Sequence, residues 1–420
     1  MPDCGADAAG GGRRAAGGRW AVGGRSMLRP YGDRRRAVIG GVRPAGRAGR
    51  GGPFARAHCD ALHDPRRIGA CYNTRMHYYP GALHMHTRHS DGTGTVDDLA
   101  AAARRAGLRW IIITDHDTLA AQSRAGWIDD VLVIVDHEIT PDRNHFLALN
   151  VNTVVDKTLP PQQFIDAVYA AGGFGIIAHP DERVHNFAKD NYRWDNWMVD
   201  GPTKRNGRVL GIELWNAMSD WGEHLTRRNL VPLLLRPELG LSGPSPETLA
   251  WWDRLNMAGR RTFGVGGVDA HAFKRRVPWG ELVIFPYQWM FRTLTNYLLL
   301  DMPLSPDARL ATHQVYAALA AGRSYFVNRL TGACPQLDWT LLRNRERYVS
   351  GDTVRLADGA LVAQIDVGCD AQVQLIHNGR VAARGVRLLR QTITEPGIYR
   401  AEAYRAGRNW LYANPVYVEA

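Results

Sequence analysis

Two histidines one residue apart, His84 and His86, are the first side chains in this sequence whose types and spacing could do chemistry. They follow the apolar run 81–83, and residues at i and i+2 of a β-strand point to the same face. Two neutral imidazoles on one face can chelate a divalent metal ion. A carboxylate, Asp91, follows shortly afterwards. The pattern therefore predicts metal coordination where a strand ends.

A second group of polar side chains ends the apolar run 110–113. Such a run is typical of a buried parallel strand, and it stops at Asp115 and His116. In α/β barrels, the carboxyl ends of the parallel strands carry the residues of the site. The two groups together therefore predict a metal site at one mouth of a barrel.

Other strand ends in the sequence carry the same types of side chain. Collected in chain order, the candidate ligands are His84, His86, Asp91, His116, Glu138, His145, His179, Asp269 and His271. If they were buried without partners, each would cost about 1–3 kcal/mol or more in lost hydration. They exceed what one tetrahedral ion uses, so we expect two or three divalent ions, with a carboxylate such as Glu138 as a bridge.

The elements that must position these residues alternate between strand and helix from residue 78 onward. Helices are predicted over 96–106, 162–171, 248–257 and 308–321, each followed closely by glycine. This alternation indicates βα units around a parallel sheet, and hence an α/β barrel over 76–332. A last strand at 324–327 is predicted to close the barrel around Arg329. Residues 181–207 show no hydrophobic period and are predicted to form a long loop, an excursion of the chain above the barrel mouth.

The last part of the chain, 333–420, changes to short alternating runs without a helix pattern. Asn378-Gly379 is a strong hairpin signal between two of these runs. We therefore predict a small antiparallel β-sandwich as an accessory domain. It contains no cluster of site residues, so a structural or subunit-contact role is expected, and a homo-oligomer stays open.

Most of the formal net charge of +11 lies in the first 75 residues, which contain 15 Arg and 5 Asp without Lys or Glu. The rest of the chain holds 37 basic and 36 acidic residues, so its charge gives no argument for a nucleic-acid partner. Residues 1–75 lack an apolar period and are predicted to be disordered, with the true start near Met76. They also lack the apolar core of a signal peptide, so no membrane partner is expected and a cytoplasmic location is the default.

In the order and spacing of its motifs over residues 78–330, the chain resembles the PHP (polymerase and histidinol phosphatase) metallohydrolases. These motifs are His84-Met85-His86 with Ser90-Asp91-Gly92, Thr114-Asp115-His116, Glu138-Ile139-Thr140, His145-Phe146, Ala178-His179-Pro180 and Asp269-Ala270-His271. With its C-terminal sandwich, the chain most resembles the carbaryl-hydrolase-like (CehA/McbA) branch. The resemblance implies a distorted (β/α)7 barrel with a trinuclear site for Zn, Mn or Fe. It assigns the first ion to His84, His86, Glu138 and Asp269. It assigns the second to Glu138, His145 and His179, and the third to Asp91, His116 and His271.

Three places depart from the pattern of the family. Ala82 stands where an acidic residue is common, Asp136-His137 where Gly-Val is usual, and Asn144 where a glycine is common. None of them removes a ligand. The spare imidazoles His89, His137 and His185 are expected to lie at the surface or to support the ligands.

The predicted function is that of a metal-dependent hydrolase, a phosphoesterase that attacks a small anionic ester with a metal-activated water. Asp115 could accept a proton or orient a ligand, and a purely structural role is equally open. Arg183, with Lys189 and Arg193, could clamp a phosphate or simply be a solvated loop face.

Alternatives to a phosphoesterase remain at this point. The family branch raises a carbamate or aryl ester as substrate, on whose ring Trp194 and Trp197 could stack. A different class of function is a structural or interaction domain that binds metal with little turnover.

Deletion of residues 1–74 tests the interpretation of the tail. A segment without an apolar period buries little surface, so its loss is expected to leave the melting temperature and the metal content unchanged. Thermal unfolding and elemental analysis of the full and shortened chains provide the comparison. A shortened chain that unfolds or loses its metal would show that the tail belongs to the fold.

Overall fold

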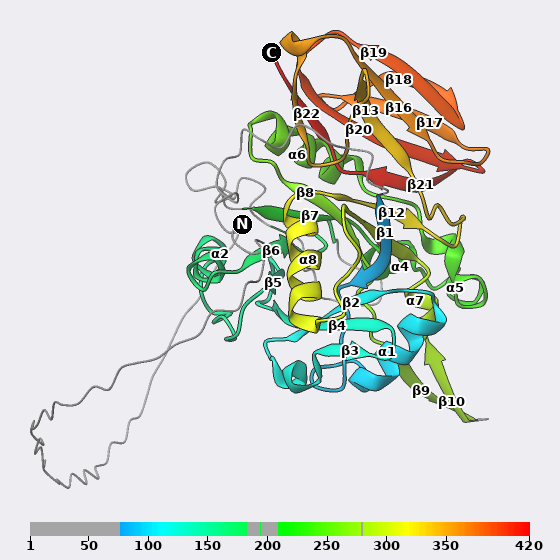
Figure 1. Cartoon of the computed structure of the whole chain (residues 1–420). Coiled ribbons are helices and arrows are strands. Elements are labelled where there is room, and N and C mark those ends of the chain that lie inside the picture. The colour runs from blue at the N-terminus through cyan, green and yellow to red at the C-terminus, as the bar shows by residue number, and fades with distance from the viewer. Residues whose placement is uncertain (1–75, 183–193, 195–208, 279) are drawn as a thin grey trace, which may run out of the picture. The chain divides into compact units, whose positions relative to one another are not determined.

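The computed structural model describes residues 76–182, 194, 209–278 and 280–420, which lie in one compact unit (Figure 1). The predicted disorder over 1–75 and most of the predicted excursion over 181–207 fall outside the described residues. None of the helices in the described ranges is long and apolar enough to cross a membrane. The chain is a mixed α/β protein with a β-rich C-terminal region.

Strands of the first part of the chain form a ring that is mostly parallel (Figure 1). In order around the ring they are β1 (His77–Leu83), β2 (Trp110–His116), β4 (Val131–Ile139), β5 (Phe146–Leu149), β6 (Phe174–Ile177), β7 (Leu210–Asn216) and β8 (Phe263–Gly267). Beyond the ends of β1 and β8, a parallel bridge joins Met85 to Ala270 and completes the ring. Because helices and further strands cover these strands, their apolar runs are buried on both faces.

The ring departs from a regular (β/α)7 barrel in two places. β5 runs antiparallel to both of its neighbours, and the segment 140–145 between β4 and β5 contains no helix. At the other side, β11 (Leu294–Leu300) pairs antiparallel with the first part of β1. β8 therefore pairs with the chain of β1 only past the end of that strand, near Met85. The α/β class of the prediction is confirmed, whereas the regular (β/α)7 repeat is not.

The prediction that a last strand closes the barrel around Arg329 is wrong. The strand exists as β12 (Ser324–Asn328), but it pairs antiparallel with β11 on one side and with β21 (Arg408–Ala413) on the other. The guanidinium of Arg329 donates to the carbonyl oxygen of Ala106 at 2.8 Å, beyond the first helix. β12 thus continues the sheet into the C-terminal region, because β11 already occupies the edge of β1.

The helices lie close to the predicted ranges, with additional short ones. The longer ones are α1 (Val96–Arg105), α2 (Pro161–Ala170), α6 (Pro246–Met257) and α8 (Ala308–Ala320). Shorter ones are α4 (Ala217–His224), α5 (Leu230–Leu235), α7 (Tyr287–Met290) and the 3₁₀ turns η1 (Ala120–Arg124), η2 (Pro237–Gly240) and η3 (Leu356–Asp358). Two short strand elements complete this part: β3 (Gly126–Ile128), and the hairpin β9 (Phe273–Val277) with β10 (Gly280–Ile284).

α1 shows why the sequence forms a helix directly after the first histidine motif. Thr95 and Asp98 form a capping box, in which each side chain accepts from the backbone N–H of the other residue. Two acidic residues occupy the first turn and two arginines the last, matching the helix dipole. Gly107 then adopts a φ of 73°, which ends the helix without a steric penalty. The loop that carries Asp91 is thereby fixed at its far end.

The C-terminal region consists of strands in two connected groups. One group contains β13 (Asp338–Arg343), β14 (Glu346–Tyr348), β16 (Leu361–Asp366) and β19 (Leu388–Ile393). The other contains β15 (Thr353–Arg355), β17 (Gln372–His377), β18 (Arg380–Val386), β20 (Gly397–Arg405), β21 and β22 (Val416–Glu419). The predicted hairpin joins β17 to β18, with φ of 49° at Asn378 and 77° at Gly379. The pairing of β15 with β22 is parallel, so the region is not purely antiparallel.

One buried asparagine, Asn414, connects the ring strands to the C-terminal strands. Its side-chain oxygen accepts from the N–H of Gly264 in β8 at 2.7 Å, and its amide donates to Gly264 O at 3.0 Å and to Ser324 Oγ at 2.9 Å. Its own carbonyl accepts from Trp339 Nε1 at 3.1 Å and from Ser350 Oγ at 2.8 Å. A single residue therefore satisfies backbone and side-chain groups of both regions.

Asn414→Ala is expected to lower the free energy of unfolding by roughly 2–4 kcal/mol, because it leaves buried groups of Gly264 and Ser324 without partners. Urea unfolding monitored by circular dichroism measures the change. Asn152→Ala, at an exposed asparagine, is the matched control and is expected to change stability by about 0.5 kcal/mol or less. Equal effects of the two substitutions would contradict the role assigned to Asn414.

Candidate metal centre

The nine side chains predicted to bind metal gather at one edge of the ring, where the parallel strands have their carboxyl ends. His84 and His86 follow β1, His116 ends β2, and Glu138 lies near the end of β4. The remaining members are His145 just before β5, His179 after β6, Asp269 and His271 after β8, and Asp91 in the loop before α1. Parallel strands bring their carboxyl ends to one edge, which explains why residues so far apart in sequence meet here.

Glu138 lies at the centre of this cluster and is fully buried. Its Oε2 lies 3.2 Å from His84 Nε2, 3.5 Å from His86 Nε2 and 3.1 Å from His116 Nδ1. Its Oε1 lies 2.9 Å from His145 Nδ1 and 3.4 Å from His179 Nε2. One carboxylate thus contacts five imidazoles, with a different set at each oxygen. This is the arrangement expected of a residue that bridges two ions.

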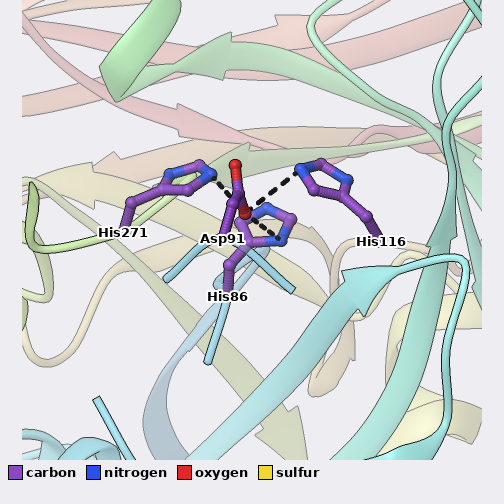
Figure 2. A group of neighbouring side chains, drawn as sticks. All are labelled: His86, Asp91, His116 and His271. Carbon is purple, nitrogen blue, oxygen red and sulfur yellow. Dashed lines mark ion pairs between the residues drawn. The ribbon is translucent and has the colours of Figure 1, made fainter. Parts of the chain in front are cut away.

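A second focus of the cluster lies at Asp91 (Figure 2). Its Oδ1 lies 3.2 Å from His271 Nε2, 3.4 Å from His116 Nε2 and 3.9 Å from His86 Nδ1. The side chain of Asp91 is 53% exposed, whereas His86 is buried beneath it. This end of the cluster is therefore the one open to solvent.

Four overlapping groups within the cluster have spacings suited to a metal ion. They are His86 with Asp91, His116 and His271; His84 with His86 and Glu138; His84 with His179 and Asp269; and Glu138 with His145 and His179. Within each group, the candidate ligand atoms lie within 4.8 Å of one another. The groups overlap because they share His84, His86, Glu138 and His179.

His86 provides a direct test of whether the residues fit a metal. Both of its ring nitrogens are buried, and neither makes a hydrogen bond of good geometry within the described residues, although Asp269 Oδ1 lies 3.2 Å from Nε2. A buried imidazole without hydrogen bonds loses its hydration uncompensated. Coordination through its nitrogens would remove that cost, so the residues present fit a metal centre.

Burial and neighbouring charges move the pKa values of the imidazoles in the cluster in different directions. Burial favours the neutral imidazole, but Glu213, Asp269 and Glu138 outweigh it and raise the pKa of His84 well above its ordinary value. Burial likewise opposes protonation of His116, yet Asp91 and Glu138 raise its pKa to about 10. Burial and the charge of His271 instead lower the pKa of His86 to about 4.

The carboxylates shift in the complementary direction. Burial alone would raise the pKa of Glu138, but the charges of His84 and His145 hold it well below its usual range. The pKa of Asp269 is also depressed, because His84 and His86 outweigh its burial. Protons on the imidazoles thus supply positive charge that divalent ions could supply instead.

Three of the candidate ligands have backbone angles that non-glycine residues rarely adopt. The φ angles are 67° at His84, 26° at His179 and 52° at Asp269. Such positions cost on the order of 1–3 kcal/mol each and gather at functional sites, where neighbouring contacts must hold them. This backbone strain indicates that the strand ends have a functional role, because it lowers the stability of the fold.

Supporting residues that the ligand prediction did not include surround the cluster. Glu213 of β7 lies 2.7 Å from His84 Nδ1, and Glu182 lies 2.9 Å from His179 Nδ1. The hydroxyl of Tyr287 accepts from the N–H groups of Thr93 and Gly94 at 3.1 Å and lies 2.8 Å from the carbonyl oxygen of His86. The only sign of Glu213 in the sequence was a carboxylate within an otherwise apolar run. No sequence pattern indicated the contacts of Tyr287.

Of the two predicted catalytic residues, the structure describes Asp115. Its carboxylate accepts from Thr87 N at 2.6 Å, from Thr87 Oγ1 at 2.7 Å and from Ser90 Oγ at 2.8 Å. These contacts hold the loop that carries Asp91. A catalytic role of Asp115 stays a prediction. Arg183 lies outside the described residues.

Other predicted candidates divide between the surface, the interior and the undescribed part of the chain. His89 is exposed, whereas His137 is buried and its Nε2 accepts from Val155 N at 3.2 Å. Burial lowers the pKa of His137 to about 4, so it is a neutral acceptor near neutral pH. Lys189, Arg193, His185 and Trp197 fall outside the described residues.

The expectation that Trp194 stacks on a substrate is wrong. Its side chain is completely buried, and its indole N–H donates to the carbonyl oxygen of His145 at 3.0 Å. The ring packs in the hydrophobic core at 6.4 Å from both Phe146 and Phe164, measured between ring centroids. Trp194 thus holds the backbone of His145, a candidate ligand, from within the hydrophobic core. It does not face the end of the cluster that is open to solvent.

Comparison with known proteins agrees with this geometry. Residues 82–196 match the PHP domain. This part of the chain carries seven of the nine candidate ligands, from His84 to His179. An uncharacterized protein of Methanocaldococcus jannaschii is 25% identical over 112 residues, which cover 23% of this chain and 66% of the relative.

Two solved structures are also similar to the chain. A two-domain protein from Bacteroides vulgatus, containing a predicted PHP-like metal-dependent phosphoesterase, is 14% identical with a TM-score of 0.37, and the match covers 81% of this chain and 95% of that one. An amidohydrolase from Chromobacterium violaceum with bound sulfate is 14% identical with a TM-score of 0.25, over 46% of this chain and 87% of that one.

Substitution of the central ligands tests the metal centre. His84→Ala, Glu138→Ala and Asp269→Ala are each expected to lower bound Mn²⁺ or Zn²⁺ by at least one equivalent and to abolish nearly all hydrolysis. Elemental analysis after gel filtration measures the loss. His89→Ala, at an exposed imidazole, is the control and should retain both properties. Equal damage at His89 would show that the ligand assignment is wrong.

Proposed function

We propose that this chain is a metal-dependent phosphoesterase that acts on a small anionic ester. The observation that carries the proposal is the cluster around Glu138, in which one buried carboxylate contacts five imidazoles. The match of residues 82–196 to the PHP domain supports the same class of chemistry. The proposed reaction at this site is hydrolysis of the ester.

The candidate ligands divide into an interior set and a set near solvent. Bound divalent ions would supply a water nucleophile of lowered pKa and positive charge for the anionic oxygens of a substrate. His84 and Glu138 lie at the interior end, and Asp91 and His116 at the end that solvent reaches. We therefore propose that the substrate approaches from the side of Asp91.

The number of ligands favours phosphorus as the reacting centre. In-line displacement at phosphorus develops charge on attacking, leaving and non-bridging oxygens, and several adjacent cations can stabilise it. A neutral carbamate carbonyl needs only one Lewis acid and one nucleophile. Four overlapping ligand groups exceed what that reaction requires.

The proposal also includes the finer assignments that the family resemblance, the strand pattern and the number of candidate ligands predict. They are the carbaryl-hydrolase-like branch, a distorted (β/α)7 barrel over 76–332 with an accessory sandwich over 333–420, and three ions instead of two. A phosphate clamp at Arg183 is a further part of it. The ions proposed are Zn, Mn or Fe, and Asp115 acts by holding the loop of Asp91.

The deciding measurement is kcat/KM for an aryl phosphate and for the matching aryl carbamate, each with Mn²⁺ and with Zn²⁺. The phosphate is expected to be hydrolysed faster, and inorganic phosphate is expected to inhibit competitively because it binds the same cations. A carbamate preference of tenfold or more, which is about 1.4 kcal/mol of transition-state binding, together with no inhibition by phosphate, would exclude the phosphoesterase. Activity on neither ester, with metal bound, would favour a metal-binding structural domain.

A further inference from the structure

We propose that Glu213 is a positioning residue of the metal centre. In this proposal it fixes the ring of His84 with Nε2 toward the centre and joins His84 to the backbone of His179. The inference rests on the proposed metal centre and is independent of the substrate. It deepens the proposed function by assigning a role to a carboxylate outside the nine candidate ligands.

The contacts of Glu213 occupy both of its oxygens. Its side chain is fully buried in the middle of β7, and Oε1 lies 2.7 Å from His84 Nδ1. Oε2 accepts from the backbone N–H of His179 at 2.8 Å and from Asn216 Nδ2 at 2.9 Å. The carboxylate therefore connects three ring strands, because His84 follows β1, His179 follows β6 and Glu213 lies on β7.

The chemistry of a carboxylate determines which nitrogen of His84 can bind an ion. An ionised carboxylate only accepts hydrogen bonds, so Nδ1 of His84 must carry a proton in this contact. The lone pair left for a metal is then that of Nε2. This nitrogen lies 3.2 Å from Glu138 Oε2 and 3.4 Å from Asp269 Oδ1, in the interior of the cluster. A carboxylate on the far nitrogen is a common way of orienting a metal-binding imidazole.

The same carboxylate restrains two strained residues. His84 has a φ of 67° and His179 a φ of 26°, both in the left-handed region. Glu213 contacts the ring of the first and the backbone N–H of the second. Because these contacts share one rigid group, the two histidines cannot relax independently. The distance between the candidate ligands His84 and His179 is thereby fixed.

The backbone of the neighbouring strand β8 passes directly against the carboxylate of Glu213. A Cβ added to Gly267 of β8 would lie 1.8 Å from Glu213 Oε1. The glycine therefore allows the backbone of β8 to pass directly against the carboxylate, and any side chain there would displace it. This close approach supports a fixed role for Glu213, since an exposed or adjustable carboxylate would not need it.

A second glutamate offers a matched comparison. Glu182 lies 2.9 Å from His179 Nδ1 and accepts from Ser219 Oγ at 3.0 Å. It is also buried, but it contacts an imidazole whose Nε2 lies 3.4 Å from the other oxygen of Glu138. Substitution of the two glutamates should therefore affect different ends of the centre.

The test uses the full chain with Glu213→Gln and Glu182→Gln, loaded with Zn²⁺. In Glu213→Gln, the amide oxygen can still accept from His179 N, which turns the amide N–H toward His84 Nδ1. Nδ1 must then accept, and the proton moves to Nε2. We expect near-native unfolding behaviour with a 10–100-fold weaker zinc affinity at one site, measured by chelator competition. Glu182→Gln is expected to weaken a different site, so that the double variant loses both.

A measurement on the unsubstituted chain keeps the proposal testable if the variants do not fold. Nitrogen NMR of histidine-labelled, zinc-loaded protein distinguishes the two tautomers, and His84 is expected to carry its proton on Nδ1 with Nε2 bound. The opposite tautomer, or full zinc affinity in a folded Glu213→Gln variant, overturns the proposal. Failure of the unsubstituted chain to bind zinc or manganese would instead overturn the proposed function, so the two failures are distinguishable.

Discussion

A buried carboxylate among imidazoles is the constraint on which the functional end of this protein depends. Glu138 has no access to solvent, and its ionised form exists only because five imidazoles lie within 3.5 Å of it. Removing such a charge from water costs several kcal/mol unless opposite charge replaces the water. The strands around Glu138 must therefore end where they do, because a shift of one residue would turn a histidine away from the carboxylate.

That requirement explains the irregular backbone at the strand ends. Extended strands alone would not bring His84, His179 and Asp269 together, and each of them adopts a left-handed φ. The contacts that hold this geometry come from buried polar groups such as Glu213 and the Tyr287 hydroxyl. The centre is thus a network in which ligands, supporting carboxylates and backbone depend on one another.

The sequence predicted the parallel strands and the candidate ligands that gather at their ends, because both leave local signals. An apolar run that ends on His116 or Glu138 can be recognised without knowing the fold. No local pattern indicates the pairing of β11 or the contacts of Tyr287, because their partners lie more than a hundred residues away. The burial of Trp194 depends on packing, which a local pattern does not show either. The contacts of Asp115 with Thr87 and Ser90 likewise became known only from the structure.

The position of β12 between β11 and β21 has a consequence for any attempt to shorten the chain. Both edges of β12 are paired, one of them with a strand from the C-terminal region. A chain ending near residue 332 would leave one edge of β12 with a row of free N–H and C=O groups and uncovered aromatic side chains, including Phe326, which stacks on Tyr412 at 5.4 Å. Open edges of this kind recruit other strands. The C-terminal region therefore also protects the strands of the ring from aggregation.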